Sequence, residues 1–188
     1  MNAKTKEILP REQVREALQA GSTLGPICGL DQDQVEVLYS YGYRYYEQNK
    51  YEEAEMFFGS ACMLNHRESR YWLALGATRQ AAGSFAEAIQ AYSRIVDCDE
   101  IPPIFAIRIA ECFLSNGDLE ESVSTIYHAV DLADATQDFE VIEEVVSKGE
   151  LLLSILENRL GDDSEEQDEQ QEAHEPAQVD ESETESLA

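Results

Sequence analysis

The chain offers few side chains that could carry out chemistry, and they lie far apart in the sequence. Its histidines are His66, His128 and His174. None of them has a cysteine or a second histidine at the spacing of a zinc site. No phosphate-binding loop or dinucleotide fingerprint is present. Because no nucleophile, base or metal cluster can be assembled from these residues, we predict a protein without catalytic residues, metal or cofactor, and not an enzyme.

The four cysteines also argue against redox or metal chemistry. They are Cys28, Cys62, Cys98 and Cys112. No Cys-x-x-Cys pair occurs, and unpaired thiols suit a reducing compartment. Cys62 and Cys112 fall inside predicted helices among apolar neighbours. We therefore expect both of them to be small buried hydrophobic side chains rather than reactive thiols.

The charge of the chain limits its partners. Its 188 residues include 39 Asp and Glu against 13 Lys and Arg, which gives a formal net charge of −26. Such a chain repels phosphate, so neither nucleic acid nor an anionic membrane surface is expected as a partner. No apolar run approaches the roughly 18–20 residues that span a bilayer, and the N-terminus leads into no signal core. We expect a cytoplasmic protein.

The C-terminal stretch differs from the rest of the chain. Residues 161–188 contain twelve Asp or Glu, no Lys or Arg and no aromatic residue. A segment of this composition buries too little apolar surface to offset its ordering entropy, so we predict a disordered acidic tail. The other expected parts are residues 1–30, an N-terminal helix and loop, and residues 31–160, the folded body.

A repeat of 34 residues supplies the elements that would position a site. Small residues recur at 42, 76 and 110 and at 54, 88 and 122, and large apolar residues recur at 58, 92 and 126. The small columns should let two helices approach closely, and the large column should fill the space toward the next unit. Asn49, Gly83 and Gly117 lie midway, where a left-handed residue ends one helix and turns into the next.

This pattern is that of the tetratricopeptide repeat. We predict an all-α fold with three tandem helical hairpins (35–68, 69–102 and 103–136) in a short right-handed solenoid. Asp31 with Gln34 suits the cap of the first helix, and Pro103 can open the third unit. An apolar stripe over 138–160 predicts a C-terminal capping helix. A short N-terminal helix over 10–20 precedes a loop at 21–30 and carries Val14, Ala17 and Leu18 on one side.

In such solenoids the first helix of each unit lines a concave surface. Helical spacing from the small column predicts that this groove is lined by Tyr39, Tyr43, Tyr46, Arg70, Leu73, Ala77, Gln80, Ile104, Ile107, Glu111 and Leu114. Tyr41 and Tyr45 interleave with the tyrosine row and are expected in the core. Two interpretations of the row stay open: the rings contact a partner, as tyrosine often does in recognition surfaces, or they cover the groove floor or pack on the N-terminal helix.

Several segments go beyond a generic repeat. They are Gly21-Ser22-Thr23-Leu24, Leu38-Tyr39-Ser40-Tyr41-Gly42, Lys50-Tyr51-Glu52-Glu53-Ala54 and Arg70-Tyr71-Trp72-Leu73-Ala74-Leu75-Gly76. Over residues 12–136 the chain resembles the class II, or translocator, chaperones of bacterial type III secretion. The acidic tail is longer than this resemblance leads us to expect.

The resemblance implies a function. Chaperones of this family bind hydrophobic translocator proteins in the bacterial cytosol and keep them soluble, holding an extended N-terminal segment in the groove. It also implies a homodimer through the helix of Val14, Ala17 and Leu18, and a regulatory side role that would need a separate regulator protein. The alternative from the repeat alone is a tetratricopeptide scaffold or regulatory adaptor for another protein partner.

Overall fold

The computed structural model describes residues 10–172, with side chains as far as Arg159. Over this range the chain is helical, with short connections and one 3-10 turn, η1. The helices are α1 (Arg11–Gln19), α2 (Leu24–Ile27), α3 (Gln32–Glu47), α4 (Tyr51–Leu64), α5 (Ser69–Ala81), α6 (Phe85–Ser93, followed by η1, Arg94–Asp97), α7 (Ile104–Asn116), α8 (Leu119–Thr136) and α9 (Phe139–Glu172).

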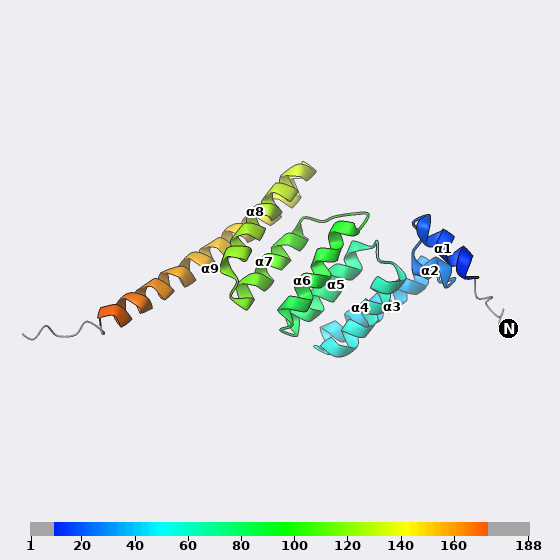
Figure 1. Ribbon diagram of the computed structural model, residues 1–188, viewed down its shortest axis with the longest axis horizontal. Helices are drawn as coiled ribbons and strands as arrows, with labels where there is room; N and C mark the ends of the chain where they lie inside the picture. Colours follow the sequence, from blue (N-terminus) through cyan, green and yellow to red (C-terminus); the bar gives the residue numbers. More distant parts are fainter. Residues whose placement is uncertain (1–9, 173–188) are drawn as a thin grey trace, which may run out of the picture.

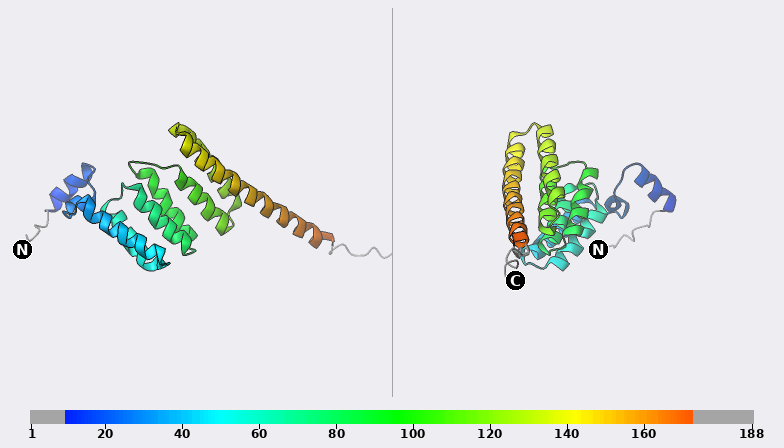
Figure 2. Two further views of the ribbon diagram at one scale, coloured as in Figure 1. Left: turned by 180° about the vertical axis from the view of Figure 1, so that it is seen from behind. Right: turned by 60° about the vertical axis from the view of Figure 1, so that its left-hand side comes forward.

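The helices from α3 to α8 form three hairpins stacked side by side (Figure 1). From α3 onward, each helix packs on the helix that follows it, and α9 packs on both α8 and α7. The N-terminal helices α1 and α2 lie at one end of the stack and α9 at the other (Figure 2). The predicted all-α fold of three hairpins with helices at both ends is confirmed.

The small and large columns of the repeat meet inside each hairpin. A Cβ atom on Gly42 would lie 2.7 Å from Cε1 of Phe58, so α3 and α4 approach closely only because this position lacks a side chain. Gly76 and Tyr92 repeat the arrangement between α5 and α6. The large column thus packs within its own unit and also toward the next one, as predicted: Phe58 shares a buried cluster with Leu75 of α5, and Tyr92 shares one with Ala110 of α7. Ile126 reaches the following helix in the same way, since its Cγ2 would lie 3.0 Å from a Cβ on Gly149.

Local signals mark where the helices begin and end. The side chain of Asp31 accepts a hydrogen bond from the Gln34 backbone, and the Gln34 side chain accepts one from Asp31, which completes the predicted cap of α3. Asn49, Gly83 and Gly117 have φ angles of 58°, 79° and 91°. These left-handed residues turn the chain between the paired helices, as the spacing predicts.

Both ends depart from the expectations. The stretch 21–30, for which the sequence predicts a loop, contains the short helix α2. The predicted capping helix does not stop at Leu160: α9 continues through Gly161 to Glu172, so residues 161–172 are helical rather than disordered. Glu and Gln are good helix formers, and extending an existing helix avoids the cost of nucleation. The rest of the predicted tail, 173–188, lies outside the described residues.

Candidate functional site: a groove along the first helices of the hairpins

A cavity of about 380 Å³ opens on the face formed by α3, α5, α7 and α9. We call this face the groove. The cavity is lined by Tyr39, Tyr43, Arg70, Leu73, Ala74, Ala77, Tyr92, Ile104, Arg108, Glu144 and Lys148. Beside it, a smaller cavity of about 210 Å³ is lined by Tyr43, Tyr46, Phe58, Ala74 and Ala77. Seven predicted groove residues therefore line one or both of these cavities: Tyr39, Tyr43, Tyr46, Arg70, Leu73, Ala77 and Ile104.

The tyrosines of this row differ in their surroundings. The Tyr39 ring packs on Phe58 and Tyr71, with ring centroids 5.5 and 5.4 Å apart. Burial raises the pKa of Tyr39. Tyr43 is 49 % exposed, and its ring is tilted by 40° and 39° against the rings of Tyr39 and Tyr46, with centroids 6.3 and 6.4 Å apart. Tyr39 is thus part of the groove floor, whereas Tyr43 presents a ring that an incoming chain can cover.

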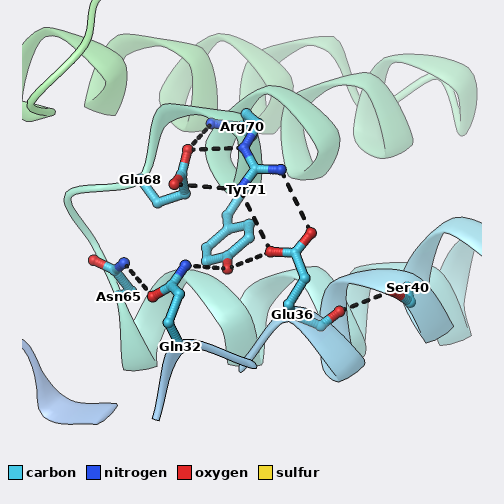
Figure 3. A network of polar contacts seen from close by, with 7 residues as sticks. All are labelled: Gln32, Glu36, Ser40, Asn65, Glu68, Arg70 and Tyr71. Atoms are coloured by element: carbon cyan, nitrogen blue, oxygen red, sulfur yellow. Dashed lines mark hydrogen bonds and ion pairs between the residues drawn. The ribbon is translucent and has the colours of Figure 1, made fainter. Parts of the chain in front are cut away.

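A polar network fixes the edge of the groove between the first two hairpins (Figure 3). The Tyr71 hydroxyl donates to Glu36 Oε2 at 3.0 Å, and burial followed by this hydrogen bond raises the pKa of Tyr71. Arg70 pairs with the same Glu36 carboxylate at 3.4 Å and with Glu68 at 3.1 Å. The Arg70 guanidinium also lies over the Tyr39 ring, 5.7 Å from its centroid. The carboxylates therefore hold Arg70 above the floor ring.

A second network ties the hairpins together at the other end of α5. The Tyr92 hydroxyl donates to Gln80 Oε1 at 2.8 Å, and Gln80 Nε2 donates to Glu111 Oε2 at 2.9 Å. Arg108 donates to both oxygens of Glu111, at 3.2 and 3.0 Å. The predicted groove residues Gln80 and Glu111 are thus half-buried and bonded to each other. They line neither of the two cavities, and they orient Arg108, which does.

Two predicted groove residues are wrong. Ile107 and Leu114 lie in the core, 0 % and 6 % exposed. The cause is α9, which packs along α7: a Cβ on Gly149 would be in van der Waals contact with Cδ1 of Ile107, at 3.9 Å, and Arg159 of α9 donates to the carbonyl of Leu114. Tyr41, expected in the core, is instead 45 % exposed, while its neighbour Tyr45 is half-buried and stacks on Phe57 at 5.4 Å.

Six residues that line the two cavities are not among the predicted groove residues: Phe58, Ala74, Tyr92, Arg108, Glu144 and Lys148. Arg108 could have been found, because it follows Ile104 by one helical turn just as Ile107 does. The sequence does not indicate Glu144 and Lys148, because the apolar stripe of the predicted capping helix shows only the face that covers the end of the stack. In the structure α9 takes the position of a fourth first helix, so one of its faces borders the groove.

Two of the cysteines lie in the core of the repeats. Cys62 and Cys112 are buried as expected, and burial raises the pKa of each thiol to about 12. Within residues 10–172, no cluster of three or more His, Cys, Asp or Glu side chains could hold a metal ion. Over the same range, no helix is both long and apolar enough to cross a bilayer.

The residues predicted for a dimer interface lie on α1, where Val14 and Ala17 are half-buried and Leu18 is exposed.

Comparison with known proteins connects this groove to a family. A tetratricopeptide repeat model matches residues 35–67. The low calcium response locus protein H of Yersinia pestis is 38 % identical over 131 residues, which cover 69 % of this chain and 78 % of that protein. The chain belongs to the family of type III secretion translocator chaperones.

Solved structures of family members agree with this assignment. The translocator chaperone SycD of Yersinia enterocolitica is 34 % identical, with a TM-score of 0.64 over 71 % of this chain and 98 % of SycD. PcrH of Pseudomonas aeruginosa, solved in complex with the chaperone binding region of PopD, is 36 % identical. Its TM-score is 0.61, over 70 % of this chain and 96 % of PcrH. Both family members thus resemble this chain in sequence and in the stack of hairpins.

Proposed function

We propose that this chain is a chaperone that binds hydrophobic translocator proteins of a type III secretion system in the bacterial cytoplasm. It keeps them soluble and competent for secretion. Relatives support this assignment: PcrH has been solved with the chaperone binding regions of PopD and PopB, and SycD with a peptide of the translocator YopD. The chain acts by binding and not by catalysis.

The observation that carries the proposal is the groove itself. Its cavity of about 380 Å³ combines the exposed ring of Tyr43 with the aliphatic side chains of Leu73, Ala77 and Ile104. An extended segment with apolar side chains can place them in these hollows. Binding energy in such a surface concentrates in a few well-packed anchors, and aromatic residues are prominent among them.

The charge of the chain supports the second part of the function. A translocator must later enter a membrane, so before secretion it exposes apolar surface that promotes aggregation. A chaperone with a formal net charge of −26 gives the complex a strong negative charge, and the repulsion between complexes keeps them apart. No nucleotide is required for holding the segment, because the groove binds it at equilibrium.

We place a self-association surface on α1. Val14, Ala17 and Leu18 share one side of this helix, and the described residues of α1 are exposed or half-buried. A second copy could cover this apolar side without blocking the groove, which lies on other helices. The dimer is a separate part of the proposal and does not affect the groove assignment.

Co-expression with candidate translocators of a type III secretion system tests the proposal. We expect a stable complex by affinity purification and native mass spectrometry, weakened at least about tenfold by Tyr43→Ala. Tyr127→Ala is the matched control, because Tyr127 is 61 % exposed but lies on α8, away from the groove. A folded chain that binds no translocator would leave a tetratricopeptide scaffold or adaptor with another partner.

A further inference from the structure

Two large apolar side chains remain exposed on α9 next to the groove. Leu151 is 62 % exposed and Ile155 is 37 % exposed. They lie one helical turn apart, so they form a single apolar strip. The core face of α9 does not include them, since that face is made by Val145, Gly149, Leu152 and Leu156, all of which are buried. The strip therefore has no partner within the described part of the chain that buries it.

The position of the strip follows from helical geometry. Residues 144, 148, 151 and 155 are spaced by four, three and four, which places them along one face of an α-helix. The first two, Glu144 and Lys148, line the groove cavity together with Ile104 and Arg108 of α7. Leu151 and Ile155 thus continue, along α9, the same wall that already borders the cavity.

Contacts between α7 and α9 fix which part of α7 faces the strip. At one end of the helix pair, Lys148 and Arg108 line the same cavity. At the other end, Arg159 Nη1 donates to the carbonyl of Leu114 at 3.0 Å. Leu151 and Ile155 lie between these two points. The facing stretch of α7 therefore includes Glu111, which Gln80 and Arg108 hold in place.

We propose that Leu151 and Ile155 form a second anchor subsite for the translocator segment that occupies the groove. This inference rests on the proposed function and specifies more of its ligand. The occupant is the same extended segment, because the strip is continuous with the cavity wall. One or two aliphatic side chains of the segment cover the strip.

The distance between the subsites sets a spacing in the ligand. Going from α3, which carries Tyr43, to α9 crosses three helix-to-helix steps of about 8–10 Å each, or about 24–30 Å. An extended chain advances about 3.3 Å per residue. Apolar side chains that reach both the Tyr43 ring and the strip should therefore lie about eight residues apart in the translocator. A ligand with only one of these anchors should bind more weakly.

The test compares Leu151→Ser/Ile155→Ser with the control Phe139→Ser. Phe139 is also on α9 and is 76 % exposed, but it is outside the 144–155 row. The probe is the N-terminal region of the translocator that co-purifies with the chain, labelled for fluorescence anisotropy. We expect the double variant to bind the intact region about tenfold more weakly, since two buried aliphatic contacts are lost. Phe139→Ser should bind as the unsubstituted chain does.

Nested truncations of the same probe locate the second anchor. Once the residue about eight positions from the first anchor is removed, the double variant and the unsubstituted chain should bind equally. A photo-crosslinking residue at 151 should also capture the translocator, whereas one at 139 should not, and this readout does not depend on the stability of the double variant. Equal binding of the intact region by the double variant, with no crosslink from 151, would overturn the subsite but leave the proposed function standing. A chain that binds no translocator at all would overturn both.

Discussion

The ring of Tyr92 occupies the space into which a side chain at Gly76 would project: a Cβ atom there would stand 2.4 Å from Cε1 of the tyrosine. The ring cannot withdraw easily, because it is fully buried and its hydroxyl is bonded to Gln80. This contact sets how closely α5 and α6 approach. It therefore also sets where Leu73 and Ala77 of α5 lie in the groove.

Gly76→Ala should accordingly destabilise the protein by about 1–3 kcal/mol, the usual cost of overpacking a filled core. Gly59→Ala is the matched control in α4, since a Cβ there meets nothing within 4 Å. In the control, the better helix propensity of alanine should instead add about 0.5–1 kcal/mol. Urea unfolding followed by circular dichroism measures both. Equal effects of the two substitutions would show that the ring yields and that the contact does not hold the hairpin.

The hairpins could be predicted from the sequence because of this same contact between a small residue and a large ring. A repeat must place a small residue opposite a ring at a fixed interval, so the spacing of Gly42, Gly76 and their partners is visible in the sequence. The turns are visible for a similar reason, because Asn49, Gly83 and Gly117 occupy a backbone region that few residues tolerate. Constraints that act within one unit could thus be found without the structure.

Constraints that act between units could not be found from the sequence alone. Ile107 and Arg108 both follow Ile104 at helical spacing, and only the position of α9 decides that the first is covered and the second faces the groove. Composition also does not decide the structure of the segment that begins at Gly161, since an acidic segment rich in Glu and Gln is compatible with a solvated helix as well as with disorder. In both cases the missing information is how α9 continues the stack.

Removing either of two groove tyrosines should have different consequences. Tyr39→Ala should lower stability by about 2 kcal/mol, because its ring packs on Phe58 and Tyr71 in the floor. Tyr43→Ala should change stability by less than about 1 kcal/mol, since its ring is half-exposed. Thermal unfolding and translocator affinity, measured on the same samples, separate the two roles. A large loss of stability in Tyr43→Ala would make that ring structural and would remove it from the proposed anchors.

Alkaline solution should destabilise the fold through the buried thiols. The pKa of Cys62 and of Cys112 is about 12 in the folded chain, against about 8.5 when unfolded. Between these values the unfolded state loses protons that the folded state keeps, so the free energy of unfolding falls as pH rises. The decrease should begin near pH 8.5 and reach at most about 1.4 kcal/mol per pH unit for each thiol.

Denaturant unfolding at a series of pH values checks this expectation. Between about pH 8.5 and 10, Cys62→Ala/Cys112→Ala should make the decrease shallower, whatever the substitution does to stability at pH 7. A smaller decrease should remain, because burial also raises the pKa of Cys98, to about 11. Above about pH 10 the decrease should become steeper again, because burial also raises the pKa of Tyr71 and Tyr92 above the usual range of tyrosine. An unchanged slope below pH 10 in the double variant would assign the alkaline transition to other groups.

Arg67 should control how firmly the N-terminal helix is held to the repeats. Its Nε donates to Asp99 Oδ1 at 2.9 Å, and its Nη1 donates to the carbonyl of Gly21 at 3.4 Å. One exposed side chain thus joins the segment after α1 to the connections that precede α5 and α7. Arg67→Ala should leave global stability nearly unchanged, since exposed ion pairs contribute little. Amide hydrogen exchange in residues 11–23 should nevertheless become faster, because exchange measures local opening, and loss of this tether makes local opening easier.

Arg94→Ala is the control, as Arg94 forms a comparable exposed pair with Asp97 at 3.5 Å but contacts nothing near α1. If exchange in residues 11–23 were the same in both variants, α1 would be held by its contacts with α2 alone, and Arg67 would have no part in positioning the proposed dimer surface.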